Sequence, residues 1–408
     1  MSEVWPGPGW WMASDGQWYP PELHPYFQRP LPPSQPRGTN RWAIIGVTLA
    51  LVLVVVALGA TILAVSSPNP SPGSVKIHGV TPVYIAPLTG FAGYHWLGDV
   101  HQISAQWRVP AIAAKTSVGH ASTWIGAQGN GDNSPFIQVG VTEDKGGPGD
   151  AFYEEFWSDT AVSFHPHPLG VVDPGDLISA SMTRENQGWS LTVDDQTSKT
   201  PVTKLIAYGV GASFTSGEWI QEDPTDSAQA AVDLPYPETS TVSFQRLMVN
   251  GQPPHLDLTD GQVLIAADGI ILVPSTVRQD AFTLAPPTGV AATYLHDAAG
   301  LDAAVSAYSV EIASWSSLPL ATRTIDVQHL SAAYQTNASE LKAQQWPRAA
   351  RPDVLVLTNQ LLRLVSDLRA WTAAGLQTKG NVYLTLRSDQ EIAPVADKVR
   401  ADLGLPPS

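Results

Sequence analysis

The stretch LISASMTRENQGWSLTV at residues 177–193 decides the fold class of this protein. It holds two short runs, LISASMT and WSLTV, on either side of a turn that contains Asn186 and Gly188. Similar runs, bounded by Gly, Pro, Asn and Asp, are FIQVGV (136–141), AVSFHP (161–166), KLIAYGV (204–210), TVSFQRLMV (241–249) and VLIAADGIILV (263–273). Short runs at a spacing of roughly ten residues are typical of all-β domains. Residues 76–285 are therefore predicted to form an antiparallel β-sandwich or barrel.

Residues 286–408 follow a different pattern, because Leu and Ala recur there at helical spacing. The segments are 296–315, 327–346, 354–371 and 396–404, and they are separated by Pro319, Pro347, Pro352 and Gly375. Such spacing predicts an antiparallel bundle of three or four helices. We expect its histidines, His296 and His329, to be surface or packing residues and find no chemistry in this region.

Composition excludes several classes of protein. The 408 residues include 35 Pro, 33 Gly and no Cys, so disulfide scaffolds, zinc fingers, iron–sulfur clusters and thiol nucleophiles are ruled out. The net charge is -15, and residues 67–285 hold 23 acidic against 9 basic side chains. A nucleic-acid partner needs a basic surface, so none is expected.

Ahead of the β domain lies a predicted membrane anchor at residues 42–65. These 24 residues carry no charge and are long enough to cross a bilayer of about 30 Å. A cleaved signal peptide would have a shorter apolar region of ~7–15 residues near its start, whereas a 41-residue leader precedes this one. Arginines precede the span and the next basic residue is Lys76, so the positive-inside rule predicts a single-pass protein of the cell membrane. Residues 1–41 would be cytoplasmic and the β domain extracellular.

The leader at 1–41 is rich in Trp and Pro, and residues 66–75 form a Pro/Ser linker. The stretch PGWWMASDGQWYPPE (8–22) resembles small Trp/Gly/Pro modules that precede a membrane span. The alternative is a Pro-rich tail whose aromatic side chains lie at the bilayer interface.

Several well-known catalytic motifs are missing from the sequence. It has no G-x-S-x-G elbow, no H-E-x-x-H zinc helix and no P-loop. Asp159-Thr160-Ala161 lacks the glycine of an aspartic-protease loop. The pair His165 and His167 lies in a Pro-rich HPHP turn without a nearby carboxylate. No metal and no cofactor are therefore predicted.

Instead, aromatic and polar motifs are spaced through the β domain in one order. They are Trp107-Arg108-Val109-Pro110, Thr123-Trp124-Ile125-Gly126, Ile137-Gln138-Val139-Gly140-Val141, Phe152-Tyr153-Glu154-Glu155-Phe156-Trp157, Pro174-Gly175-Asp176 and Glu218-Trp219-Ile220-Gln221-Glu222. Each motif is weak alone. Taken together and in this order, they resemble the glutamic peptidases, also called eqolisins or peptidase family G1.

The resemblance implies a lectin-like, concanavalin-like β-sandwich of two antiparallel sheets that hydrolyses polypeptides at acid pH with a Gln/Glu dyad. Matched motif by motif, the dyad falls on Gln138 and Glu222. Glu155 and Trp157 would line the cleft beside the scissile bond, and Trp124 would pack below the dyad.

Three positions depart from the family pattern. Gln128 and Thr142 stand where fungal members usually carry Asp, and Pro224 replaces an aromatic residue. These changes concern the pH tuning and the specificity pocket more than the type of reaction.

The dyad is also chemically reasonable in its own right. One carboxylate can take a proton from water and later return it to the leaving amine, and a glutamine amide can donate to the oxyanion. Alone, however, Gln138 could simply face solvent, and Glu218 and Glu222 could be surface charges that share one face of a strand. An acid optimum is expected, with Glu155 as the group that must stay protonated.

Three functional classes remain open from the sequence. The leading one is a membrane-anchored acid endopeptidase. The second is a lectin-like module that binds glycan or peptide without cleaving it, and the third is an inactive relative that serves as a scaffold for the helical bundle.

Overall fold

The computed structural model describes residues 11–12, 18–19, 89–116, 118–129, 134–145, 151–160, 166–224, 235–266, 269–312, 315–376 and 391–407. The predicted membrane span, the linker at 66–75 and most of the run at 161–166 lie outside these residues, so these predictions stay untested. Among the described helices, none is long and apolar enough to cross a membrane. In the leader, β1 (Trp11–Met12) and β2 (Trp18–Tyr19) pair antiparallel.

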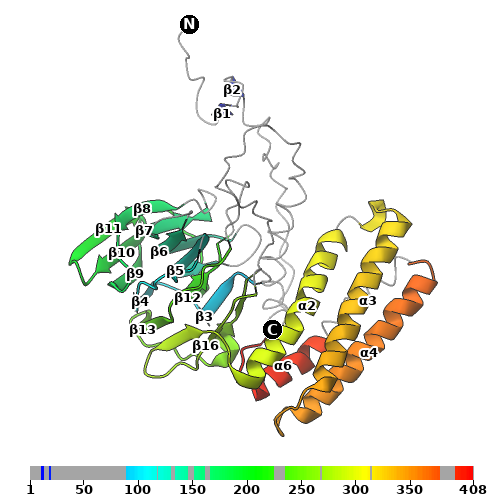
Figure 1. Ribbon diagram of the computed structural model, residues 1–408. Coiled ribbons are helices and arrows are strands. Elements are labelled where there is room, and N and C mark those ends of the chain that lie inside the picture. The colour runs from blue at the N-terminus through cyan, green and yellow to red at the C-terminus, as the bar shows by residue number, and fades with distance from the viewer. Residues whose placement is uncertain are drawn as a thin grey trace, which may run out of the picture. The chain divides into compact units, whose positions relative to one another are not determined.

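Residues 91–285 form two antiparallel sheets, as the sequence predicted (Figure 1). The first sheet has eight strands in the order β11-β10-β9-β4-β13-β17-β16-β15. Its strands are β4 (Gln102–Arg108), β9 (Leu177–Glu185), β10 (Gly188–Asp195), β11 (Thr200–Ile206), β13 (Val242–Val249), β15 (Leu264–Ile265), β16 (Ile271–Pro274) and β17 (Phe282–Ala285). A short 3-10 helix, η3 (Leu258–Asp260), precedes β14.

The second sheet has seven strands in the order β14-β3-β12-β5-β6-β7-β8. They are β3 (Phe91–Leu97), β5 (Gly119–Gln128), β6 (Phe136–Lys145), β7 (Phe152–Asp159), β8 (His167–Val171), β12 (Ser216–Glu222) and β14 (Gly261–Gln262). Its central strands β12, β5, β6 and β7 carry four of the six motifs.

The stretch 177–193 forms a β-hairpin, in which the two predicted runs are the paired strands. Strands β9 and β10 pair from Glu185 opposite Gly188 to Ile178 opposite Asp195. Gly188 has φ of 135°, and a Cβ there would lie 1.9 Å from the carbonyl oxygen of Ile206, so only glycine fits this turn.

The main core lies between the two sheets. Ile103, Met182 and Leu191 contribute from the first sheet, and Ile125 and Val139 from the second, all within one buried cluster. Burial of each such side chain stabilises the fold by about 1.5–3 kcal/mol. Because side chains alternate along a strand, the residues next to these in the second sheet point to its outer face.

The C-terminal region is helical, as predicted. It contains α2 (Gly289–Ile312), η4 (Trp315–Ser317), α3 (Leu320–Ala343), α4 (Arg351–Ala373) and α6 (Ala393–Asp402). Each long helix begins about a turn or two before the predicted segment. The bundle shares its apolar cluster with Val263, Ile265 and Ile271 of the β domain, so the two regions are joined by a common core.

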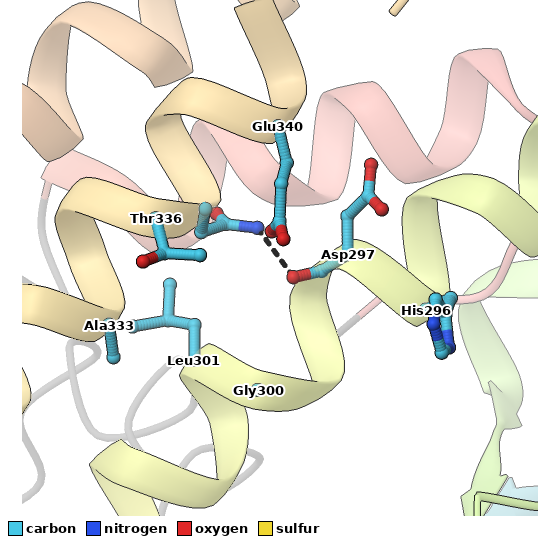
Figure 2. Close-up of a pocket in the computed structure, with 8 residues that line it drawn as sticks. His296, Asp297, Gly300, Leu301, Ala333, Thr336 and Glu340 are labelled. Carbon is cyan, nitrogen blue, oxygen red and sulfur yellow. Dashed lines mark hydrogen bonds between the residues drawn. The ribbon is translucent and has the colours of Figure 1, made fainter. Parts of the chain in front are cut away.

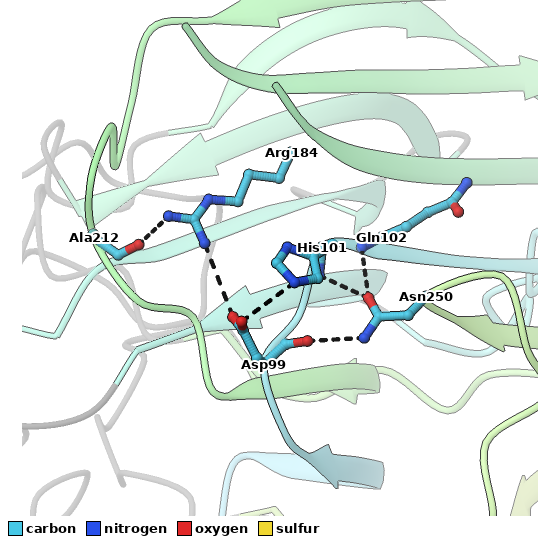
Figure 3. Close-up of polar contacts among 6 residues, drawn as sticks. All are labelled: Asp99, His101, Gln102, Arg184, Ala212 and Asn250. Atoms are coloured by element: carbon cyan, nitrogen blue, oxygen red, sulfur yellow. Dashed lines mark hydrogen bonds and ion pairs between the residues drawn. The ribbon is translucent and has the colours of Figure 1, made fainter. Parts of the chain in front are cut away.

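At one end of the sandwich, hydrogen bonds and ion pairs connect neighbouring turns (Figure 3). The Asn250 side chain accepts from the backbone N–H groups of His101 and Gln102 and donates to the Asp99 carbonyl oxygen. The carboxylate of Asp99 lies 3.2 Å from His101 Nε2 and 4.0 Å from Arg184 Nη1. These contacts join turns from both sheets.

Candidate active site

The outer face of the second sheet carries the candidate site. A small apolar cluster, separate from the main core, lies on this face and consists of Trp124, Phe136, Phe156 and Ile220, with Phe91 packed against it. Trp124 contacts Phe136 edge to face at 5.5 Å between ring centroids and Phe91 at 6.3 Å. Both members of the predicted dyad lie on this face.

Directly paired residues of the adjacent strands β12, β5, β6 and β7 form rows across the outer face, called rungs below. Glu222, Ser122, Thr142 and Glu154 make one rung. Ile220, Trp124, Gly140 and Phe156 make the next, and Glu218, Gly126, Gln138 and Ser158 the third. Trp124 therefore lies in the rung between those of Glu222 and Gln138.

Two donors hold the Glu222 carboxylate in place. Trp124 donates from Nε1 to Glu222 Oε2 at 2.6 Å, and Ser122 donates from Oγ to the same oxygen at 3.3 Å. Burial raises the pKa of Glu222 to about 7, although both hydrogen bonds act to lower it. The side chain remains partly exposed. Glu222 is thus a carboxyl that can change its protonation state near neutral pH.

Gln138 is buried and oriented by Ser158. Its Nε2 donates to Ser158 Oγ at 2.8 Å. Within the described part of the chain, its buried Oε1 has no hydrogen-bond partner. A glutamine amide has two N–H groups, so one remains for another acceptor.

Glu218 lies in the same rung as Gln138, with only Gly126 between them. It is buried, and Ser216 donates to its Oε1 at 3.2 Å. Burial raises the pKa of Glu218 to about 7, and the charge of Glu222 adds to the shift. The two carboxyls are therefore electrostatically linked along one strand.

Glycine at position 140 lets the strands approach at the centre of the face. A Cβ there would lie 2.2 Å from the carbonyl oxygen of Thr123 and 2.5 Å from Cβ of Trp124. Any larger residue would push Trp124 away from Glu222.

Two predicted site residues are not brought to this face. Glu155 and Trp157 alternate with Glu154 and Phe156, so they point to the opposite, interior side of the sheet. Trp157 stacks on His167 at 4.3 Å. Burial raises the pKa of Glu155 to about 7, with the charges of Asp195 and Asp194 adding. The structure therefore does not bring Glu155 and Trp157 to the face that carries Gln138 and Glu222, and their predicted role beside the scissile bond stays a prediction.

Glu154, the neighbour of Glu155, lies on the outer face in the rung of Glu222. Burial raises its pKa, and the charge of Asp144 adds. Ser122 and Ser158 were also missed, since a lone serine in a strand gives no signal. The alternation of β7 could have identified Glu154 only if its pairing with β6 had been known.

The departures from the family pattern fall around this face. Thr142 is buried beside Glu154, and its Oγ1 lies 3.5 Å from the Glu154 carbonyl oxygen. Gln128 ends β5, and Pro224 lies just beyond β12. Neither contacts the dyad through a described hydrogen bond.

Metal-binding groups are not assembled in the described residues, where no set of three or more His, Asp or Glu could hold an ion. In the bundle, a pocket between α2 and α3 is lined by His296, Asp297 and Glu340 among others (Figure 2). Asn337 Nδ2 donates to the Asp297 carbonyl oxygen there at 2.8 Å. His296 and His329 are exposed, as expected for surface residues.

Comparison with known proteins identifies the domain. Residues 90–284 match the sequence model of the Peptidase A4 family. This β-sandwich belongs to that family. It is a hydrolase of the glutamic-peptidase type, as the ordered motifs had indicated.

Solved structures of glutamic peptidases are similar to the chain. One is a crystal structure of scytalido-glutamic peptidase with a transition state analog inhibitor, with 20% identity and a TM-score of 0.41. Another is SCP-B, a member of the Eqolisin family of peptidases, in complex with the tripeptide Ala-Ile-His, with 21% identity and a TM-score of 0.40. Each match covers 49% of this chain and 100% of the other. None of the curated proteins compared with the chain matches it.

Proposed function

We propose that the Peptidase A4 domain is an endopeptidase in which Glu222 transfers the protons and Gln138 stabilises the oxyanion. One observation carries this proposal. Glu222 is a partly exposed carboxyl fixed by Trp124 and Ser122 on the same sheet face as Gln138.

The reaction follows from the chemistry of these groups. Ionised Glu222 takes a proton from a water molecule as the water oxygen bonds to the peptide carbonyl carbon. The carbonyl oxygen becomes an oxyanion, which accepts a hydrogen bond from the N–H of Gln138 that Ser158 does not use. When the C–N bond breaks, Glu222 gives its proton to the leaving nitrogen and is ready for another cycle.

The pKa of Glu222 changes the expected pH dependence. A general base must be ionised, and burial raises the pKa of this carboxyl to about 7. Catalysis by ionised Glu222 therefore predicts an acid limb close to neutrality, rather than the optimum well below neutrality that the sequence suggested. Glu155 faces away from the site, so Glu218 replaces it as the candidate for a group that must stay protonated.

The test compares two isosteric variants in the full chain, solubilised in detergent, with denatured casein as substrate from pH 4 to 9. Glu222→Gln keeps the size of the side chain and should abolish cleavage. Glu218→Gln is the matched control and should cleave, with an altered alkaline limb. Cleavage by Glu222→Gln together with an inactive Glu218→Gln would move the acid–base role to Glu218 and refute the proposal.

We also propose that residues 42–65 anchor the enzyme in the cell membrane, with its peptidase domain outside. The uncharged length of this segment and the arginines before it support this orientation. The substrates would then be extracellular polypeptides.

A further inference from the structure

A set of hydrogen-bonded polar side chains lies inside the sandwich, directly behind the face of the candidate site, and one of its members, Gln221, also hydrogen-bonds Tyr236. Thr123, Glu143 and Gln221 are each fully buried, and they come from the adjacent strands β5, β6 and β12. Thr123 Oγ1 lies 2.8 Å from Glu143 Oε1 and 2.5 Å from Gln221 Oε1. Gln221 Nε2 lies 3.2 Å from Glu143 Oε2. The three side chains thus form a ring with three contacts, called the interior ring below.

The interior ring needs three donated hydrogens, one for each contact. The hydroxyl of Thr123 supplies one and the amide of Gln221 supplies another. An ionised carboxylate only accepts, so the third hydrogen must be a proton on Glu143. With that proton present, Glu143 donates to Thr123, Thr123 donates to Gln221, and Gln221 donates back to Glu143.

The orientation of the Gln221 amide does not change this count. If its oxygen and nitrogen exchange places, the nitrogen donates to Thr123 and the oxygen faces Glu143 Oε2. The carboxyl must then donate through that oxygen instead. In either orientation, ionisation of Glu143 leaves two acceptors facing each other, and one contact of the ring is lost.

The surroundings of Glu143 favour its neutral form. Burial raises the pKa of Glu143 to about 8, the hydrogen bonds from Thr123 and Gln221 act to lower it, and the charge of Asp144 raises it. None of the described groups that shift this pKa is basic. The proton that closes the ring is therefore retained at acid pH and released at alkaline pH.

Other titratable groups face Glu143 from the elements packed around it. Tyr153 of β7 and Tyr236 each have a pKa raised mainly by burial, and the charge of Glu143 raises both further. Asp223, at the end of β12, also acts on Tyr236. On β5, His120 Nε2 lies 3.2 Å from Asp144 Oδ1.

The interior ring is one residue away from the catalytic face on two strands. Thr123 precedes Trp124 and Gln221 precedes Glu222, and side chains of successive residues point to opposite faces of a sheet. Thr123 and Gln221 are also directly paired, as the β5 and β12 ladder shows. The ring and the hydrogen bond from Trp124 to Glu222 therefore connect the same two strands from their two faces.

We propose that Glu143 is a positioning residue of the peptidase, whose proton closes the interior ring and thereby holds Trp124 against Glu222. When Glu143 ionises, the ring opens and the catalytic carboxyl loses its fixed donor. This role rests on the proposed function of Glu222. It makes the interior of the sandwich a second determinant of the alkaline limit of activity.

The experiment uses the full chain in detergent and the variant Glu143→Gln, whose amide supplies the third hydrogen at every pH. Asp144→Asn is the matched control, because it removes the adjacent carboxyl and leaves the three ring contacts in place, so its activity should still fall at alkaline pH. The unfolding midpoint Tm and kcat/KM on a quenched fluorescent peptide are measured from pH 6 to 9. Thr123→Val, which cannot form the ring at any pH, and Thr123→Ser, which keeps the hydroxyl, provide a second pair.

One pH unit above the pKa of Glu143, about one molecule in ten keeps the proton. The ratio of kcat/KM at pH 9 to that at pH 7 should then be about tenfold higher in Glu143→Gln than in the wild type or Asp144→Asn. Tm of the wild type should fall about 3–5 °C more over this range, because a tenfold change corresponds to about 1.4 kcal/mol. Thr123→Val should lower kcat/KM already at pH 6, and Thr123→Ser should restore it.

Three results would overturn the proposal or separate its parts. Equal pH dependence of Tm in Glu143→Gln and the wild type would refute the ring. A flattened Tm profile with unchanged activity profiles would show a ring that does not position the site, which also refutes the proposal. A wild type that cleaves no peptide at any pH would refute the proposed function and the positioning role with it, while the Tm comparison would still decide the ring.

Discussion

Replacement of Trp124 by Phe removes one hydrogen bond from the Glu222 carboxyl and keeps an aromatic side chain at this position. The lost bond joins Trp124 Nε1 to Glu222 Oε2 at 2.6 Å. Hydrogen bonds to charged groups contribute about 1.5–3 kcal/mol, and one pKa unit is about 1.4 kcal/mol. Since this bond stabilises the ionised form, the variant should have a Glu222 pKa about one to two units higher than the wild type.

The sign of the effect on activity follows from the proposed role of Glu222 as a base. The acid limb of kcat/KM should move to higher pH by the same one to two units. At pH 6, kcat/KM should therefore fall on the order of 10–100-fold, and the loss should shrink as pH rises. The assay is the pH dependence of kcat/KM on a quenched fluorescent peptide, which reports the pKa of the free enzyme.

Two further variants separate hydrogen bonding from packing. Ser122→Ala removes the weaker donor, at 3.3 Å, and should shift the limb in the same direction by less. Phe136→Leu alters the ring that packs on Trp124 but leaves its donor in place, so the limb should stay where it is. An acid limb that Trp124→Phe does not move, or a loss of equal size at every pH, would refute the assignment of the base.

Four other outcomes are expected. Gln138→Ala should lower kcat by about 10²–10³, the scale for one oxyanion donor, and wild-type rates would make Gln138 structural. Gly140→Ala should destabilise the fold by about 1–3 kcal/mol, measured by denaturant unfolding, because its Cβ would overlap Thr123 and Trp124. Burial raises the pKa of Glu155, Glu218 and Glu222 to about 7 and that of Glu143 to about 8. In the unfolded chain these carboxyls have the ordinary pKa of 4.5, so the folded protein keeps protons that the unfolded chain has already released. Stability should thus be greatest at acid pH and fall as pH rises through 7 to 8, and a Tm that increases from pH 5 to 9 would contradict this. Protease added to intact cells should remove a C-terminal tag and spare an N-terminal one, whereas the reverse would place the peptidase domain in the cytoplasm.

The order of elements was predictable from the sequence because turns and apolar runs are local signals. Composition and the spacing of apolar residues were enough to predict the two strands in 177–193 and the change to helices after Ala285. The first residues of the helices were predicted less accurately. The first turns of α2 and α3 contain few large apolar residues, so periodicity alone begins them too late.

The candidate site was only partly predictable, since motifs identify residues but not the faces they occupy. Gln138, Trp124 and Glu222 share a face because of the way in which β5 pairs with β12 and β6. The neighbouring pair Glu154 and Glu155 depends on how β7 pairs with β6, and a shift of one residue reverses the two faces. That pairing is a tertiary property, so no count along the chain could determine it.

The usual alternation of apolar and polar residues also fails on β5, β6 and β12, because each face of these strands carries both kinds of residue. On the outer face, Trp124 and Ile220 belong to an apolar cluster beside Gln138 and Glu222. On the inner face, where apolar residues are expected, Thr123, Glu143 and Gln221 form the interior ring. Polar residues therefore occur on both sides of the same strands. Sequence alternation could not separate the residues of the candidate site from those that join the same strands behind it, because polar residues lie on both faces.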